Sequence, residues 1–165
     1  NDFASKCDLA YTDPPWEPRM VKWFETLMRK SGHHPPSNDI DNILQRLFSL
    51  TPKGIPMFIC YGALGYERVI SIAAEDGRKF VQKIEEVQTT NHSCWVLQFD
   101  SDMPMPEKAC KPFESLQRVI DWHRPSTIFE PFAGLGKLVK VMAKNGCNVV
   151  ANEMNPERAR KIPLQ

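Results

Sequence analysis

The sequence predicts an α/β fold built on a doubly wound, mostly parallel sheet with an antiparallel hairpin at one edge. Short apolar runs of strand length alternate with amphipathic segments along most of the 165 residues, the order expected of such a sheet. The run 55–61 is almost continuously apolar, as in a strand that helices cover on both faces. In 79–88 and 93–99, apolar and polar residues alternate on either side of a Thr-Thr-Asn-His turn, which is typical of a hairpin. We expect a single domain over 1–165.

The first half of the chain is predicted to hold two strands and three helices. The helix that begins at Pro18 has one broad apolar face, made of Met20, Val21, Trp23, Phe24, Leu27 and Met28. The expected elements are a strand over 7–12, a helix from Pro18 to Gly32, a helix over 40–50 that Asn38 or Asp39 caps, a strand over 55–61 and a helix over 66–77.

The second half continues the alternation after the hairpin. The segment 100–110 is expected to be a loop. Pro112 opens the next helix, and the residues predicted to face inward are Phe113, Leu116, Val119, Ile120 and Trp122. The remaining elements are a strand over 126–130, a helix over 138–145, a strand over 148–152 and a helical piece over 156–162.

The composition is that of a globular protein. Of the residues, 42% are hydrophobic and 25% are charged, and no apolar run approaches the length of a membrane span. No basic-then-apolar leader opens the chain, so we expect a cytoplasmic or nucleoid-associated protein that is neither secreted nor in a membrane. The formal net charge of +1 gives no general attraction for phosphates, so nucleic-acid binding would depend on a local patch.

Cysteine and histidine spacing gives no sign of a metal site. The five cysteines are scattered without a C-x-x-C pair, and we expect them to be reduced thiols. The pair His33-His34 has no second ligand cluster at metal spacing, so a surface loop is the favoured interpretation. No metal is predicted.

The stretch Asp13-Pro14-Pro15-Trp16 stands where the first strand ends. Two prolines fix successive backbone angles and remove two N–H donors, which leaves the carbonyls of Asp13 and Pro14 as rigid acceptors. A carboxylate, a carbonyl and the flat ring of Trp16 suit a planar group with an exocyclic NH2, because they offer two acceptors and a stacking face. The simpler alternative is an ordinary strand exit with a surface tryptophan.

A second candidate site follows the strand 126–130. Gly134 and Gly136 let the backbone approach a ligand closely in the turn between that strand and the next helix. Glu153 ends the following strand, where a carboxylate can accept hydrogen bonds from the two hydroxyls of a ribose. Together these features suit an adenosyl group, whereas the glycines alone would also fit a plain helix-entry turn. In a doubly wound sheet, both candidate sites lie at the carboxyl ends of strands, where ligands bind.

Taken together, the motifs resemble those of the S-adenosylmethionine-dependent amino-methyltransferases of DNA and RNA, in the permuted beta-type order and of the adenine-N6 type. In that family a D-P-P-W/Y motif precedes the cofactor loop, as Asp13-Pro14-Pro15-Trp16 does here. The other family motifs have counterparts in Lys111-Pro112-Phe113, Glu130-Pro-Phe-Ala-Gly-Leu-Gly136 and Glu153-Met-Asn-Pro-Glu157. Glu130 stands where Asp is commoner, and Lys137-Leu138 stands where the family usually has Thr-Thr.

The resemblance implies a Rossmann-like methyltransferase fold with S-adenosyl-L-methionine as cofactor. It assigns catalysis to Asp13, Pro14, Pro15 and Trp16. By resemblance, the cofactor-binding residues are Thr12, Asp13, Lys111, Pro112, Glu130, Phe132, Ala133, Gly134, Gly136, Glu153 and Asn155. The expected substrate-binding residues are Tyr11, Trp16 and Arg19.

The function that the resemblance implies is methylation of an exocyclic amine, with adenine N6 in DNA placed first. The alternatives are an RNA adenine methyltransferase, a methyltransferase-like subunit that binds a catalytic partner, and a methyltransferase of a small-molecule or protein amine. The target-recognition region of the family generally lies before the helix that Pro112 opens, and only 100–110 occupies that place. We therefore expect nucleic acid as substrate, DNA ahead of RNA, and a homodimer or heteromeric partner that supplies target recognition.

Overall fold

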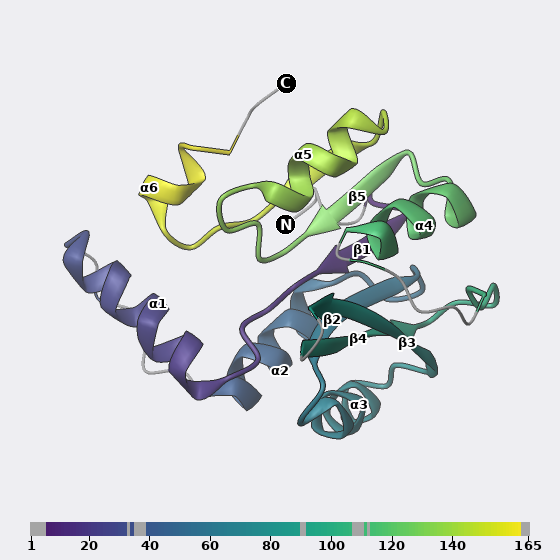
Figure 1. Cartoon of the computed structure of the whole chain (residues 1–165), viewed down its shortest axis with the longest axis horizontal. Coiled ribbons are helices and arrows are strands. Elements are labelled where there is room, and N and C mark those ends of the chain that lie inside the picture. The colour runs from purple at the N-terminus through teal and green to yellow at the C-terminus, as the bar shows by residue number, and fades with distance from the viewer. Residues whose placement is uncertain are drawn as a thin grey trace.

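The computed structural model describes residues 6–32, 34, 39–89, 92–106, 111 and 113–162. Within them, six strands form one sheet in the order β3-β4-β2-β1-β5-β6, with helices on both faces (Figure 1). The strands are β1 (Leu9–Thr12), β2 (Met57–Gly62), β3 (Phe80–Thr89), β4 (His92–Phe99), β5 (Thr127–Glu130) and β6 (Asn148–Ala151). The helices are α1 (Pro18–Lys30), α2 (Ile40–Leu50), α3 (Tyr66–Glu75), α4 (Glu114–His123), α5 (Lys137–Lys144) and α6 (Pro156–Ala159). None of these described helices is long and apolar enough to cross a membrane.

The sheet is parallel at its centre and antiparallel at one edge. β1 lies between β2 and β5 and is parallel to both, and β6 pairs in parallel with β5. β4 is antiparallel to both β2 and β3, so the β3–β4 hairpin forms the other edge. This arrangement confirms the predicted doubly wound, mostly parallel sheet with an edge hairpin. It also brings the carboxyl ends of β1, β2, β5 and β6 to one side of the sheet.

Hydrophobic cores fill both faces of the sheet. On one face, side chains of α2 and α3 pack against Ala10, Ile59 and Leu97. On the other face, side chains of α4 and α5 pack against Leu9 and Tyr11. Successive side chains of a strand point to opposite faces, so β1 contributes to both cores and all four of its residues are buried.

Helix α1 forms where the sequence predicts it, but the sheet does not cover its apolar side. Val21 is its one buried residue, and Trp23 is 52% exposed. Figure 1 shows α1 beyond the body of the sheet and near α6. The proline pair after β1 carries the chain away from the sheet, so the apolar side of α1 lines a cleft instead of entering the core.

Helix α4 also departs from the prediction, because Phe113 and Trp122 do not face inward. They are 45% and 44% exposed, respectively. Phe113 lies before the first helical residue with a φ of 63°, so it is not on the helix surface at all. The buried stripe instead passes through Leu116, Val119 and Ile120 to His123, whose ring packs edge-on against Phe58 at 5.2 Å between centroids. Trp122 lies off this i, i+3, i+4, i+7 stripe.

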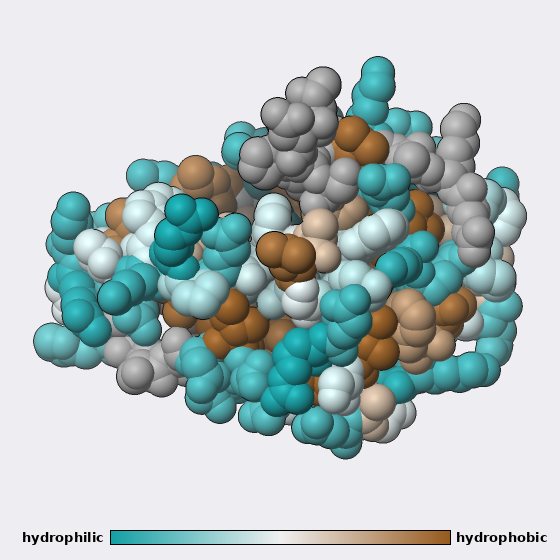
Figure 2. Space-filling view, turned by 60° about the horizontal axis from the view of Figure 1, so that its bottom comes forward, coloured by the Kyte–Doolittle hydropathy of each residue, from teal (hydrophilic) through white to brown (hydrophobic). Residues whose placement is uncertain are grey.

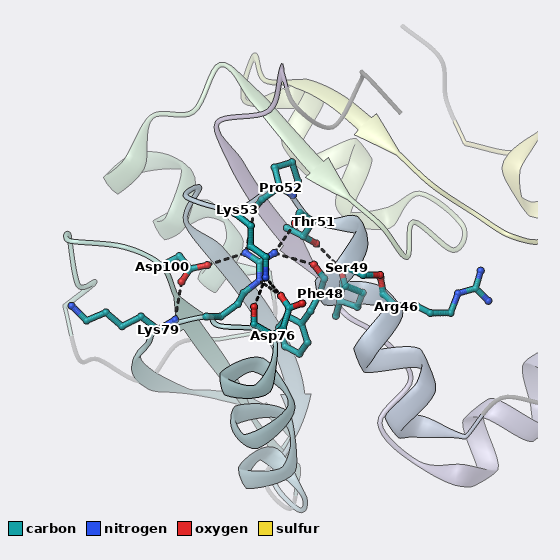
Figure 3. A network of polar contacts seen from close by, with 11 residues as sticks. Arg46, Phe48, Ser49, Thr51, Pro52, Lys53, Asp76, Lys79 and Asp100 are labelled. Carbon is teal, nitrogen blue, oxygen red and sulfur yellow. Dashed lines mark hydrogen bonds and ion pairs between the residues drawn. The ribbon is translucent and has the colours of Figure 1, made fainter.

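A buried arginine holds together the amino-terminal end of β2. The side chain of Arg78 is 0% exposed, and its guanidinium donates to Asp100 Oδ2 at 2.8 Å. Its Nε also lies 3.4 Å from Asp76 Oδ2. The same guanidinium also donates to the carbonyl oxygens of Phe48, Thr51 and Pro52. Figure 3 shows these three residues together with Asp76 and Asp100. The network therefore joins the end of α2 to the ends of α3 and β4.

Replacing Arg78 by leucine is expected to lower the free energy of unfolding by about 3 kcal/mol, because Asp100 and three carbonyl oxygens lose their donor in the interior. Denaturant unfolding followed by circular dichroism measures the loss. Arg68 provides the control, since its ion pair with Asp41 is 2.8 Å long but half exposed. We expect Arg68→Leu to cost less than about 1 kcal/mol. Equal losses in the two variants would contradict this account of Arg78.

Candidate active site

Three turns of the chain meet at the carboxyl ends of β1, β5 and β6. Asp13 follows β1, the turn 131–136 follows β5, and Glu153 comes shortly after β6. Because these strands are parallel neighbours, their ends lie side by side. The two candidate sites of the sequence are therefore parts of one region.

Two adjoining clefts open in this region. The first cleft lies between the glycine turn, α6 and α1, and its walls include Gly134, Glu153, Asn155, Val21, Phe24 and Met28. The second cleft is lined by Tyr11, Cys60, Glu86, Phe113 and Leu135. The residues that belong to the walls of both are Asp13, Pro15, Phe24, Phe132, Gly134 and Arg158. Asp13 therefore borders both hollows.

The carboxyl group of Glu130 joins the ends of β1 and β5. Its Oε1 accepts hydrogen bonds from Thr12 Oγ1 at 2.8 Å and from the backbone N–H of Phe132 at 2.9 Å. Thr12 and Glu130 are both 0% exposed, so they lie beneath the clefts and not on their walls. Burial raises the pKa of Glu130 to about 8, and the nearby negative charge of Asp13 adds to this effect. At neutral pH the group is therefore mostly a neutral acid.

Asp13 combines access to solvent with a perturbed carboxyl group. Its backbone and side chain are reached by water, but the cleft walls displace enough solvent around the carboxylate to raise its pKa to about 6. Trp16 Nε1 donates to Asp13 Oδ1 at 3.2 Å and opposes this shift, whereas the charge of Glu86 adds to it. At pH 7 Asp13 is mostly ionised and can accept hydrogen bonds.

A glycine at the end of β2 makes room for the ring of Trp16. A Cβ atom on Gly62 would lie 2.2 Å from Trp16 Cε3, closer than any real contact. The absence of a side chain at Gly62 therefore makes room for the indole, and its Nε1 then reaches Asp13. Half-buried Trp16 is thus positioned by both neighbours.

The turn after β5 depends on its two glycines. Gly134 and Gly136 have φ values of 56° and 75°, which residues with a Cβ rarely adopt. The Gly136 N–H donates to the Ala133 carbonyl at 2.8 Å and closes the turn. The Ala133 N–H donates to the Asn152 carbonyl at 3.0 Å, which ties the turn to the segment after β6. Ala133 itself is buried.

The segment after β6 is a capped turn that presents Glu153 to the first cleft. Asn155 Oδ1 accepts from the N–H groups of Glu157 at 3.0 Å and Arg158 at 3.3 Å, and it caps α6. The Asn155 N–H donates to Glu153 Oε1 at 2.7 Å. Asn155 thus has a structural role, although it lines the cleft. Among the described residues nothing donates to Glu153 Oε2, which leaves that oxygen for a ligand.

Contacts between α1 and α6 close the first cleft on its outer side. The guanidinium of Arg158 lies over the rings of Trp23 and Phe24, at 5.2 Å and 4.9 Å from their centroids. Ser31 Oγ donates to Glu157 Oε2 at 3.3 Å. These contacts hold α1 where Val21, Phe24 and Met28 face the glycine turn.

A chain of polar groups forms the floor of the second cleft. Tyr11 is buried, and its ring stacks on Phe58 with centroids 6.4 Å apart. Its hydroxyl is 2.8 Å from Ser115 Oγ, which in turn hydrogen-bonds to Glu86. Burial raises the pKa of Tyr11 well above its usual range, so the hydroxyl stays protonated.

The remaining predicted site residues lie in different places. Pro14 is buried after the end of β1 and its side chain lines neither cleft, whereas Pro15 lines both. Lys111 lines neither cleft, and its N–H donates to Glu114 at the start of α4. Arg19 is 89% exposed, pairs with Glu17 and lines neither cleft. Pro112 falls outside the described residues.

Among the residues of the region that carry no motif in the sequence are Cys60, Gly62, Glu86 and Arg158. Gly62 could have been found, because a glycine ending an otherwise apolar strand often marks a close approach by another group. Glu86 and Cys60 could not have been found in this way, because they lie on β3 and β2. The register in which these two strands pair with β4 decides whether the two side chains meet.

Comparison with known proteins gives matches in structure but not in sequence. No protein-family model and no curated protein matches the chain. The crystal structure of M1.HpyAVI matches with a TM-score of 0.66 at 16% identity, over 97% of this chain and 89% of that chain. The M1.HpyAVI–SAM complex matches with a TM-score of 0.63 at 17% identity and the same coverage. TTHA0409 of Thermus thermophilus, assigned as a DNA modification methylase and complexed with S-adenosyl-L-methionine, gives 0.64 at 14% identity, over 97% and 87%.

At these identities the likeness shows the fold. The chain has the Rossmann-like α/β fold of these neighbours, which confirms the fold class expected from the sequence.

The contact between Gly62 and Trp16 can be tested by a double-mutant cycle. Gly62→Ala is expected to displace the indole and to lower the free energy of unfolding by about 1–3 kcal/mol, the usual cost of overpacking. In a Trp16→Ala background the added methyl group finds space, so the same substitution should cost less than about 0.5 kcal/mol. Denaturant unfolding of the four proteins measures both steps. An equal cost in both backgrounds would show that Trp16 is not what Gly62 accommodates.

Proposed function

We propose that the protein is an S-adenosyl-L-methionine-dependent methyltransferase that acts on an exocyclic amine, with adenine N6 in DNA as its substrate. The observation that carries this proposal is the position of Asp13 on the border of two clefts. The fold neighbours support the choice of cofactor, because M1.HpyAVI and TTHA0409 have both been solved with it. The assignment of TTHA0409 as a DNA modification methylase supports DNA. Such a substrate would place the protein in the cytoplasm or at the nucleoid.

The first cleft has the features that an adenosyl cofactor needs. Gly134 lines it without a side chain, so the backbone can approach a ligand closely. Glu153 keeps one carboxylate oxygen for a ribose hydroxyl. The apolar residues Val21, Phe24 and Met28 offer a surface for a purine ring. When bound, S-adenosyl-L-methionine supplies a methyl group that its sulfonium already activates.

Asp13 is the residue that would prepare the substrate amine. An aromatic amine is a poor nucleophile, because its lone pair is delocalised into the ring. Asp13 accepts one N–H bond and the Pro14 carbonyl accepts the other, which draws the nitrogen toward tetrahedral geometry and frees the lone pair. With the cofactor bound, its methyl group would pass to this nitrogen, which would then lose a proton. An acid with a pKa of about 6 can take that proton and release it to water at neutral pH.

The second cleft offers rings to hold the face of a base. Phe113 and Phe132 line it, whereas Trp16 lines neither cleft and lies beside Asp13. Tyr11 already stacks on Phe58 within the core, so Phe132 is a better candidate than Tyr11 for stacking on a base. A base extruded from its stack would enter here with its amine toward Asp13.

The short segment after β4 favours a second subunit for target recognition. Its described part, 100–106, packs back on the sheet: Met105 is buried, and Gln98 Nε2 and Gln82 Nε2 donate to the carbonyls of Met103 and Met105 at 2.9 Å and 2.8 Å. The backbone at Met103 and Met105 is therefore held against the sheet, although the Met103 side chain is 51% exposed. The second candidate function, a methyltransferase-like subunit that works with a partner or a second copy, follows from this observation.

Two basic residues of α1 lie beside acids. Arg19 pairs with Glu17 at 2.9 Å and Arg29 lies 3.9 Å from Glu25. Figure 2 shows a face on which hydrophilic residues surround several small hydrophobic groups, without one broad apolar patch. Binding of the isolated chain to duplex DNA should therefore be weak, and single-stranded or locally opened substrate should be preferred.

The cofactor assignment predicts that Glu153→Ala weakens binding of S-adenosyl-L-methionine by about 1–3 kcal/mol, because a charged hydrogen-bond acceptor is lost. Isothermal titration calorimetry measures this change. Glu75→Ala, an exposed acid on α3, serves as the control and should bind like the wild type. Wild-type protein that binds neither the cofactor nor S-adenosylhomocysteine at millimolar concentration would refute the assignment.

Methyl transfer itself is tested with labelled S-adenosyl-L-methionine and a panel of duplex DNA, single-stranded DNA, RNA and free amines. Digestion of the product to nucleosides should yield N6-methyladenosine in its deoxy form. Label in the ribonucleoside would favour the RNA alternative. Cofactor binding without transfer to any substrate, followed by transfer when a partner protein is added, would favour the subunit alternative.

The acceptor role of Asp13 predicts a pH dependence. Because Asp13 is ionised above its pKa of about 6, kcat/KM should rise about tenfold per pH unit below that value and level off above it. Asp13→Asn is expected to reduce kcat by at least about 100-fold at every pH and to abolish the rise of kcat/KM with pH. The affinity for the cofactor should stay within about threefold of the wild-type value. Asp41→Asn, an exposed acid on α2, is the matched control. Near wild-type turnover by Asp13→Asn would disprove the mechanism.

A further inference from the structure

Two thiols and a carboxylate meet at the floor of the second cleft. Cys60 Sγ and Cys94 Sγ are 3.3 Å apart, and Glu86 Oε1 lies 3.9 Å from the first and 3.6 Å from the second. All three side chains are buried, and Cys60 and Glu86 line the cleft. Among the described residues, this is the one group of three or more His, Cys, Asp or Glu side chains close enough to share a metal ion.

The pairing register of the sheet creates this cluster. Glu86 on β3 is paired with Cys94 on β4, and Cys94 is paired with Gly62 on β2. Cys60 precedes Gly62 by two residues on β2, and residues two apart on a strand face the same side of the sheet. The Cys60 side chain therefore points to the same face as the side chains of Cys94 and Glu86. In the sequence the two cysteines are 34 residues apart, which is why cysteine spacing alone predicts no metal.

We propose that Cys60, Cys94 and Glu86 bind a zinc ion whose fourth coordination position faces the second cleft. A tetrahedral zinc ion with sulfur at about 2.3 Å and oxygen at about 2.0 Å requires sulfur–sulfur and sulfur–oxygen separations of about 3.8 Å and 3.5 Å. The observed separations of 3.3, 3.9 and 3.6 Å agree with these values to within about half an ångström. With two thiolates and one carboxylate as ligands, the doubly charged ion would form a site with a net charge of −1. Binding displaces both thiol protons to solvent, and water fills the open position.

The surroundings of Glu86 support a ligand role. Ser115 hydrogen-bonds to Glu86 Oε2, so the carboxylate is oriented with Oε1 toward the sulfurs. The Tyr11 hydroxyl, 2.8 Å from Ser115 Oγ, extends this outer shell. Metal ligands are commonly held by hydrogen bonds of this kind.

The same pair of thiols is poorly placed for a disulfide. Cys60 and Cys94 are diagonal neighbours on an antiparallel pair, because their direct partners are Val96 and Gly62. Diagonal Cβ atoms are about 7 Å apart, whereas a disulfide needs about 3.5–4.5 Å. Forming the bond would require a shift of the pairing between β2 and β4. Coordination needs no such shift.

Zinc binding can be measured without cofactor or methyl transfer, so its outcome is independent of the proposed function. The full chain is stripped with a chelator, mixed with zinc chloride, dialysed and analysed for metal. We expect about one zinc ion per chain in the wild type and in Cys147→Ser, whose thiol is buried away from the cluster. Cys60→Ser and Cys94→Ser should each retain less than about a tenth of this amount, and Glu86→Gln should bind at least about tenfold more weakly.

Cobalt substitution gives a second measurement. Cobalt(II) in the wild type should show thiolate charge-transfer bands and the intense visible bands of tetrahedral coordination, and these should persist in Cys147→Ser but not in Cys60→Ser. If the cysteine variants fail to fold by circular dichroism, the zinc-dependent rise of the wild-type melting temperature and its loss in Glu86→Gln decide the matter. Folded wild-type protein without bound zinc would overturn the inference. So would zinc retained in full by Cys60→Ser, or a mass about 2 Da lower that marks a disulfide.

Discussion

The hydrogen bonds of Glu130 are the interaction on which the candidate site depends. One carboxyl oxygen holds the end of β1 through Thr12 and the start of the glycine turn through Phe132. The carboxylate of Asp13 and the backbone of Gly134 consequently border the same clefts. Because burial keeps the Glu130 carboxyl group largely neutral near pH 7, this group does not place a full negative charge beside Asp13.

The buried arginine network and the two clefts lie at opposite ends of the sheet. Arg78 and its acceptors tie the helices to the amino-terminal end of β2, while both clefts open at the carboxyl ends of the parallel strands. The glycine turn with its positive φ values and the raised pKa values of Asp13 and Glu130 lie at the second end. At the first end, a buried arginine with acceptors from several segments holds the elements together.

Much of this arrangement could be predicted from the sequence. The strand and helix alternation predicted the sheet, and the positions of Asp13 and Gly134 at strand ends placed both clefts on one side. The amphipathic pattern of α1 identified its apolar side correctly, but such a pattern does not say what covers that side. The burial of Thr12 and Glu130 beneath the clefts, and the meeting of Glu86 with Cys60, depend on strand register and packing across the sheet, which local sequence does not encode.

The loose attachment of α1 has a dynamic consequence. With Val21 as its one buried residue, the helix is held chiefly by the contacts of Arg158 and Glu157 on the short α6. A ligand in the first cleft would contact α1 on one side and the glycine turn on the other. It would therefore add to the contacts that hold α1 against the rest of the protein. Occupancy of the cleft should therefore slow hydrogen–deuterium exchange of the α1 amides, while those of the central strand β1 are already protected by the sheet on both sides.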